Sequence, residues 1–223
     1  MQPNCIYGLV VLEHQTRVSR PPSFGDILSD GVNLVLRRRA LSPLTASALD
    51  DVARGEPFRC SAEVAVNDPD VDPLLTEVRD PAARAFLAKD IRAIVTAFGQ
   101  LLARRHVHAR LTLVDDDACR KLHTDNVTIR LICTYAGPAT EWVRDADVLR
   151  ENLCRIDVDV DTANRSILRR PDALQRAQPG DVLLLKGEAY PGNRGRGAVH
   201  RSPPIRDRGL RRLVLGLDEH ELG

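Results

Sequence analysis

The sequence has few aromatic residues and almost no net charge. Phe, Trp and Tyr make up 4% of its 223 residues, and 32 Lys and Arg stand against 31 Asp and Glu, which leaves a formal net charge of +1. Proteins that bind nucleic acid usually present a basic groove and aromatic side chains on which bases stack. The composition therefore disfavours nucleic acid as a partner, and it removes the electrostatic reason to expect an anionic membrane.

Long apolar runs and cysteine pairs are also missing. No segment approaches the roughly 18 apolar residues of a membrane span, and the start of the chain lacks the basic and apolar stretches of a signal peptide. No Cys-x-x-Cys pair occurs among the five cysteines, which are Cys5, Cys60, Cys119, Cys133 and Cys154. This disfavours a secreted disulfide framework and a zinc ribbon. We expect a cytoplasmic protein without a membrane partner.

What is present is an ordinary globular composition, with 43% hydrophobic and 28% charged residues. A chain of this length buries roughly 70% of its unfolded surface, so its core needs no disulfide or metal. We expect an N-terminal segment, residues 1–60, that packs on the core, and a jelly-roll metal-binding domain over residues 61–223. Together they should form one compact unit.

The clearest helix in the sequence begins at Asp80. Aspartate is a good N-cap, and Pro81 is tolerated at the first helical position because its missing N–H would be unpaired there. Apolar residues then follow at spacings of four, three, four and three, which places them on one helical face; they are Leu87, Ile91, Ile94, Phe98 and Leu101. The pattern predicts a long helix that supports a sheet. A second helix is expected over residues 42–53.

From residue 109 onward the hydrophobic pattern has a period of two, which is typical of strands. Besides weaker candidates at 8–13 and 32–36, the predicted strands are 109–114, 127–135, 181–186, 197–199 and 212–217. Short strands after one long helix predict a mainly β fold with α-helical support (α+β), as a barrel or jelly roll. The charged residues 144–178 interrupt the pattern as an insertion, a lid or a pair of short helices.

A candidate metal site begins with His123-Thr124-Asp125, just before a predicted strand. In an extended chain residues i and i+2 point to the same side, so this imidazole and this carboxylate would project together. His200 ends another short predicted strand. Two histidines and a carboxylate can occupy one face of an octahedral metal and leave positions open for substrate and dioxygen. We predict His123, Asp125 and His200 as metal ligands, with unrelated structural roles as the alternative.

Arg212 begins the last predicted strand. A guanidinium there can bind a carboxylate through two parallel hydrogen bonds. Val214 and Gly216 share its face of the strand and leave room for a ligand. The alternatives are an arginine paired with a nearby aspartate at the strand end, and Arg211 or Arg208 as the residue that binds the carboxylate.

The order of these landmarks resembles that of the iron(II)/2-oxoglutarate oxygenases. The landmarks are HTD at 123–125, GDVLLL at 180–185, His200 and Arg212. In that superfamily a double-stranded β-helix, a jelly-roll or cupin-like fold, holds iron through His-x-Asp…His, and an arginine near the last strand binds the cosubstrate. The resemblance implies such a core here, with Fe(II) held by His123, Asp125 and His200 and 2-oxoglutarate by Arg212.

A closer resemblance links the chain to an uncharacterised bacterial family, domain of unknown function 1826. It rests on LICTYAGPATEW at 131–142, GDVLLLKG at 180–187 and GAVHRSPP at 197–204, and it covers roughly residues 75–218. The family brings no established activity. Some of its members are thought to be associated with zinc-limitation genes, which keeps a metal-handling role open.

Four further residues are candidates for supporting roles. The oxygenase resemblance implies that the Tyr135 hydroxyl helps to hold 2-oxoglutarate, and the alternative is a core tyrosine with a local hydrogen bond. Glu141 could accept a hydrogen bond from a ligand histidine or be a charge at a strand edge. Trp142 and Arg201 are the remaining candidates for the surroundings of the metal or for substrate contact.

Together these residues predict an Fe(II)- and 2-oxoglutarate-dependent oxygenase that hydroxylates or otherwise oxidises a small molecule or peptide. The alternative is a non-redox, zinc-handling protein of the same barrel fold. Cys119 lies close to His123 and Asp125 in the sequence, Cys133 follows, and thiolate and imidazole both suit zinc. Ligation by either cysteine would favour the zinc alternative. The sequence does not indicate the oligomeric state.

Overall fold

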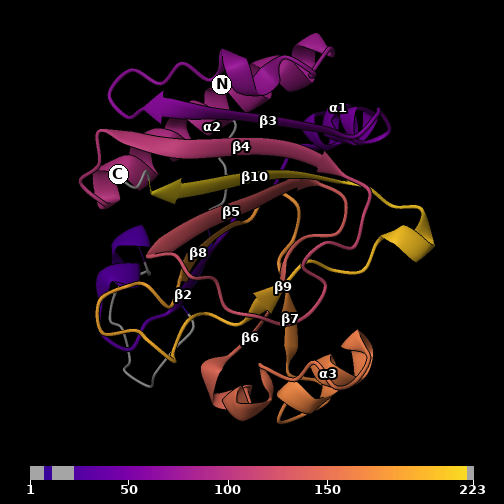
Figure 1. Cartoon of the computed structure of the whole chain (residues 1–223). Helices are drawn as coiled ribbons and strands as arrows, with labels where there is room; N and C mark the ends of the chain where they lie inside the picture. Colours follow the sequence, from indigo (N-terminus) through magenta and orange to yellow (C-terminus); the bar gives the residue numbers. More distant parts are fainter. Residues whose placement is uncertain (1–7, 12–22, 220–223) are drawn as a thin grey trace.

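The computed structural model of the chain describes residues 8–11 and 23–219 (Figure 1). Its large sheet contains β1 (Gly8–Val11), β2 (Leu34–Arg38), β3 (Phe58–Ala65), β4 (His106–Val114), β5 (Ile129–Ala136), β8 (Val182–Lys186) and β10 (Arg212–Glu219). Its small sheet contains β6 (Glu141–Val143), β7 (Leu174–Arg176) and β9 (His200–Arg201). The α-helices of the described residues are α1 (Pro43–Ala53), α2 (Pro81–Leu101) and α3 (Val160–Ile167).

Both sheets are antiparallel. The large sheet has the order β1-β2-β8-β5-β10-β4-β3, and the small sheet has the order β7-β6-β9. The fold is therefore a mixture of helices with a dominant antiparallel sheet, as the hydrophobic pattern predicted. None of the helices in residues 23–219 combines the length and the hydrophobicity that crossing a membrane requires.

The long helix α2 supports one face of the large sheet, which confirms its prediction. The Asp80 side chain accepts a hydrogen bond from the backbone N–H of Ala83 at 2.7 Å, so the predicted N-cap is formed. The apolar face of α2 packs with α1 against alternate residues of the central strands, in one cluster that includes Leu87, Ile91, Phe98, Leu111, Leu131 and Leu215. Burial of this face drives the helix onto the sheet.

On the other face of the large sheet, only the part around β2 and β8 is apolar. Around β2 and β8, the side chains of Leu36, Leu183 and Leu185 meet Trp142 of the small sheet in a second apolar cluster. The small sheet therefore lies over β2 and β8, and β4 and β3 extend beyond it (Figure 1). This asymmetry leaves part of the inner face of the large sheet free to line a cavity.

Several predicted boundaries needed correction. The prediction of a strand at 197–199 was wrong, because the strand there is β9, two residues at His200–Arg201. β3, β6 and β7 were not predicted from the sequence. Residues 12–13 of the first predicted strand lie outside the described residues. Residues 144–178 contain two short 3-10 helices, Asp145–Asp147 and Arg150–Asn152, together with α3 and β7. The domain division at residue 60 stays a prediction, and β3 runs across it.

The apolar face of α2 yields a stability prediction. Leu87 is fully buried in this core, whereas Leu44 at the start of α1 is 81% exposed. Leu87→Ala should lower the free energy of unfolding by about 2–5 kcal/mol, because it leaves a cavity in the core. Leu44→Ala, which removes the same atoms from a solvated site, should change it by less than about 0.5 kcal/mol. Urea unfolding of both variants measures the difference, and equal effects would contradict this packing.

Candidate metal centre

The backbone brings the two predicted histidine ligands together, although they lie 77 positions apart in the sequence. His123 precedes β5 and His200 begins β9, and each donates its backbone N–H to the carbonyl oxygen of the other at 3.0 Å. Directly opposed residues of an antiparallel pair project their side chains to the same side. The two imidazole rings accordingly lie with their centroids 4.7 Å apart.

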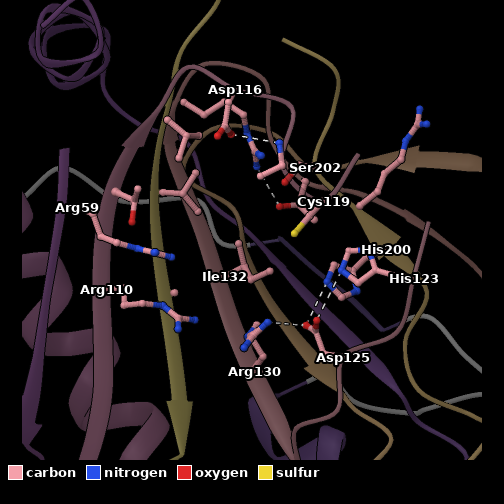
Figure 2. Close-up of a pocket in the computed structure, with 18 residues that line it drawn as sticks. Arg59, Arg110, Asp116, Cys119, His123, Asp125, Arg130, Ile132, His200 and Ser202 are labelled. Carbon is pink, nitrogen blue, oxygen red and sulfur yellow. Dashed lines mark hydrogen bonds and ion pairs between the residues drawn. The ribbon is translucent and has the colours of Figure 1, made fainter. Parts of the chain in front are cut away.

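Asp125 completes the group. Its carboxylate oxygens lie 3.6 Å from Nε2 of His123 and 3.3 Å from Nε2 of His200. One potential ligand atom from each of the three residues lies within 4.8 Å of the other two. The predicted set of His123, Asp125 and His200 is thus brought to one place, at the edge of the cavity that Figure 2 shows.

Each imidazole is oriented by a backbone carbonyl. Nδ1 of His123 lies 2.7 Å from the carbonyl oxygen of Lys121, and Nδ1 of His200 lies 3.0 Å from that of Ala198. A carbonyl oxygen can only accept, so each Nδ1 carries the proton and each Nε2 keeps a lone pair in the neutral ring. Both free nitrogens face Asp125. This is the arrangement by which proteins orient histidine ligands for a metal.

The electrostatics of the group favour a bound cation. Burial alone would raise the pKa of Asp125. Hydrogen bonds that the protonated forms of His123 and His200 donate through Nε2, together with the positive charge of Arg130, hold that pKa well below its usual value. Burial opposes the ionised form of His123, yet the neighbouring Asp125 raises its pKa overall. The carboxylate is therefore ionised at neutral pH and attracts positive charge, which a metal ion would supply.

Arg130 holds Asp125 from the side opposite the histidines. Its Nη1 donates to Oδ2 of Asp125 at 2.9 Å, and its Nε and Nη2 donate to the two carboxylate oxygens of Asp218 at 2.6 and 3.0 Å. Arg130 was not predicted as a residue of the site. Its position on the predicted strand after Asp125 was visible, but its two carboxylate partners, Asp125 and Asp218, lie 93 positions apart in the sequence.

Arg212 is buried in the same cavity, 3% exposed, and its partners are neutral. Its Nε donates to the carbonyl oxygen of Pro138 at 2.6 Å, and its Nη2 lies 3.3–3.4 Å from the hydroxyls of Thr134 and Thr140. Among the described residues no carboxylate forms an ion pair with it. Burial lowers the pKa of Arg212 to about 10, so the side chain is still charged at neutral pH.

Strand alternation separates Arg212 from its neighbour. Arg211 donates to the backbone carbonyl oxygens of Arg54 and Gly55 and does not line the cavity. Gly137 fixes this end of β10, because a Cβ there would lie 1.9 Å from the carbonyl oxygen of Arg211 and its φ is +76°. Of the two adjacent arginines, Arg212 is therefore the one that faces the predicted metal ligands.

Tyr135 and Cys133 lie on the other face of β5, so the structure does not bring them to the site. Tyr135 is buried against α2, where its hydroxyl donates to Asp90 at 2.8 Å. Tyr135 therefore does not line the cavity, and the prediction that it contacts 2-oxoglutarate was wrong. Cys133 is buried beside Arg39, and burial raises the pKa of its thiol to about 12. Cys119 lines the cavity but is not part of the three-residue group.

The remaining candidates belong to the small sheet. Glu141 is buried and accepts hydrogen bonds from Nε of Arg176 and Nε of Arg201, both at 2.7 Å, and not from a ligand histidine. Arg201 also lines the cavity. Trp142 is the cross-strand partner of His200, so its indole fills the space between the sheets beside that ligand. Glu141 thus ties the small sheet together, and Trp142 supports the position of His200.

Comparison with known proteins places the chain in a family. It belongs to the family described as "Protein of unknown function (DUF1826)", which matches residues 19–218. A comparison with curated proteins found no match.

Solved structures with a similar chain path include three dioxygenases or hydroxylases. The Fe(II)/(alpha)ketoglutarate-dependent dioxygenase TqaL is 15% identical, with 80% of this chain and 75% of that chain covered and a TM-score of 0.42. The dioxygenase for auxin oxidation in rice is 11% identical, with 81% and 70% covered and a TM-score of 0.43. A Pseudomonas putida prolyl-4-hydroxylase is 12% identical, with 88% and 96% covered and a TM-score of 0.39. What this chain does has to be inferred from its own residues.

The metal centre is tested by a pair of histidine variants. His200→Ala should weaken metal binding by more than the roughly 10–100-fold that loss of a supporting residue costs, because it removes a ligand. The protein should stay folded, since its main core lies on the other face of the sheet. His106→Ala, at an exposed histidine of β4, should bind metal as the unmodified protein does. Calorimetric titration with Fe(II) without oxygen, alongside circular dichroism, measures both. Unfolding of His200→Ala or unchanged affinity would contradict the assignment.

Proposed function

We propose that this protein is an oxygenase that depends on Fe(II) and 2-oxoglutarate. The observation that carries the proposal is that one cavity is lined by an open group of metal ligands and by a buried arginine, Arg212, which has no carboxylate partner in the described part of the chain. Each feature alone fits several functions. Together they fit a cosubstrate with two functional ends. One end would chelate the metal at its free coordination positions, and a carboxylate at the other end would bind the arginine.

The donor set suits Fe(II). Two imidazole Nε2 atoms and one carboxylate form the 2-His-1-carboxylate group that non-haem iron oxygenases use, and it leaves the other coordination positions open. Within residues 23–219 no cysteine joins the three ligands. A structural zinc site would require a fourth protein ligand. The zinc-handling alternative therefore has less support than the oxygenase.

Arg212 is the residue that would hold 2-oxoglutarate. A buried guanidinium is costly unless an anion is paired with it. The carboxylate of the cosubstrate would supply that charge, and the hydroxyls of Thr134 and Thr140 lie beside the guanidinium, where they could donate to the same group. Val214 and Gly216, which share the cavity face of β10 with Arg212, leave room for the chain of the ligand.

We also propose that the two sheets form a double-stranded β-helix, the arrangement of a jelly roll. In chain order, β5 belongs to the large sheet, β6 and β7 to the small one, β8 to the large, β9 to the small and β10 to the large. Repeated passage between two facing antiparallel sheets is what a jelly roll requires. The apolar cluster around Leu183 and Trp142, between the sheets, supports this arrangement.

The proposed reaction couples two oxidations. Bound iron would supply the reactivity by which O2, 2-oxoglutarate and a substrate C–H group give succinate, CO2 and a C–OH group, with one oxygen atom of O2 in succinate and the other in the product. The chain would hold the metal through His123, Asp125 and His200 and orient the cosubstrate through Arg212. Ile132 and Val214 contribute apolar walls. A cavity of about 230 Å³ suits a small-molecule substrate.

Arg212 and its neighbour offer a matched test of the cosubstrate site. Arg212→Ala should retain Fe(II) but weaken 2-oxoglutarate binding by about 2–5 kcal/mol, the cost of truncating one partner of a buried charge pair. Arg211→Ala removes an equal charge from the other side of the strand and should bind 2-oxoglutarate normally. Anaerobic titration with Fe(II) and 2-oxoglutarate follows the visible charge-transfer band of the chelated keto acid. The absence of a band in the unmodified protein, or equal affinities in the two variants, would contradict the proposal.

A further inference from the structure

The cavity extends well beyond the metal ligands and Arg212. Only part of the inner face of the large sheet is covered by the small sheet, and toward β4 and β3 this face lines the cavity instead. Arg59 of β3 and Arg110 of β4 point into it (Figure 2), and Thr112 of β4 also lines it. None of the three is needed to hold the metal or 2-oxoglutarate. Binding of the metal and of 2-oxoglutarate therefore leaves the part of the cavity at β3 and β4 available for another ligand.

The side chains that line the cavity carry an excess of positive charge. Five arginines but only two aspartates line it; they are Arg59, Arg110, Arg130, Arg201, Arg212, Asp116 and Asp125. Most of these arginines have a carboxylate partner. Arg201 is paired with Glu141, and Arg130 with Asp125 and Asp218.

Arg59 and Arg110 are the arginines of the β3–β4 part. Arg110 has to share its partner, because its Nη2 and that of Arg130 both donate to Oδ2 of Asp218, at 2.7 and 3.0 Å. Arg59 forms no ion pair or hydrogen bond within the described part of the chain. Thr112, the Cα partner of Arg59 on β4, has a hydroxyl that is likewise without a hydrogen bond among the described residues. This part of the cavity is thus lined by the unpaired guanidinium of Arg59, the guanidinium of Arg110, which shares its carboxylate partner, and the free hydroxyl of Thr112.

This group is separate from the Arg212 site. Arg110 is the Cα partner of Gly216, four residues along β10 from Arg212, which is roughly 13 Å of strand at 3.3–3.4 Å per residue. At Gly216 no side chain stands over the sheet, and a Cβ there would lie 3.8 Å from Nη2 of Arg110. A ligand can therefore lie over Gly216 with one end at Arg110 while Arg212 holds another anion.

We infer that the substrate of this cavity is a small molecule with a carboxylate or phosphate group, which Arg59 and Arg110 bind opposite the metal ligands. This inference rests on the proposed function, because it names the molecule that the metal centre would oxidise. Guanidinium groups bind carboxylate and phosphate through charge-assisted, often paired hydrogen bonds. Figure 2 shows Arg59 and Arg110 side by side, across the cavity from His123, Asp125 and His200. The anionic group would be anchored at β3 and β4, and the rest of the molecule would extend toward the metal.

The test uses three probes of similar shape on the anaerobic complex of the full chain with Fe(II) and saturating 2-oxoglutarate. Phenyl phosphate and phenylacetate carry the two candidate anions, and phenylacetamide is the neutral control. Calorimetry should show that at least one anionic probe binds about tenfold or more tightly than phenylacetamide, the ratio expected for a charge-assisted hydrogen bond. The tighter of the two anionic probes identifies the preferred group.

Arginine variants connect this binding to Arg59. Arg59→Ala should weaken the preferred anionic probe about tenfold, and Arg59→Lys should restore part of the loss because it restores the charge. Arg79→Ala removes an exposed arginine outside the cavity and should change nothing. Arg59 is itself exposed and without a partner among the described residues, so its variants should fold normally. Equal binding of the neutral and anionic probes, or no effect of Arg59→Ala, would overturn the inference.

The charge-transfer band of the same samples separates this inference from the proposed function. A band of normal strength in Arg59→Ala, together with weaker probe binding, supports both. A normal band with no preference for anionic probes overturns the inference alone. Loss of the band in Arg59→Ala would mean that Arg59 holds 2-oxoglutarate, which overturns the inference as well. Anionic probes that bind through Arg59 without any band in the unmodified protein would overturn the oxygenase while supporting the anion site.

Discussion

The site depends on one short piece of backbone pairing, the two hydrogen bonds between His123 and His200. This bridge brings together segments that are far apart in the sequence and places both imidazoles on the same side. The carbonyl oxygens two residues before each histidine then fix the ring tautomers, so that both Nε2 atoms face Asp125. Because backbone atoms orient both imidazoles, the sheet architecture fixes these two candidate ligands, whereas the Arg130 side chain holds Asp125.

The large sheet divides stability and chemistry between its two faces. Leu111, Leu131 and Leu215 point toward α1 and α2 and build the main core. The residues that alternate with these leucines along each strand point to the other face, where Arg110, Arg130 and Arg212 line the cavity. Charged side chains that would be costly in the core can therefore be concentrated on one face, while hydrophobic burial on the other face stabilises the chain. Trp142 of the small sheet fills the apolar part of the cavity face, next to His200.

Much of this could be predicted from local patterns in the sequence. The periodicity of α2 and its Asp80 N-cap gave the helix, and alternation within β10 distinguished Arg212 from Arg211. The Tyr135 contact was implied by the oxygenase resemblance, and ligation by Cys133 stayed an alternative. Alternation could not decide either case, because it holds only within a continuous strand. Residues between Asp125 and the start of β5 at Ile129 are not extended in a strand. The side on which Asp125 projects therefore does not determine which residues of β5 face the cavity.

The residues that the sequence analysis missed depend on long-range pairing. Arg130 could be seen on its strand, but its contact with Asp218 requires that β5 and β10 be neighbours. Arg59 lies on β3, whose mixed polar pattern did not indicate a strand and which joins the sheet through β4. Both arginines became visible as cavity residues only after the strand order was known, because neighbours in a sheet need not be neighbours in the sequence.

The formation of succinate would show whether this protein is a 2-oxoglutarate-dependent oxygenase. We expect that protein loaded with Fe(II) converts 2-oxoglutarate to succinate in the presence of O2, at a slow rate even when no other substrate is added. Zinc-loaded protein and the His200→Ala variant should form no succinate. Nuclear magnetic resonance detects succinate in all three samples. Iron bound at full occupancy without succinate above the level of the His200→Ala variant would contradict an oxygenase at this site.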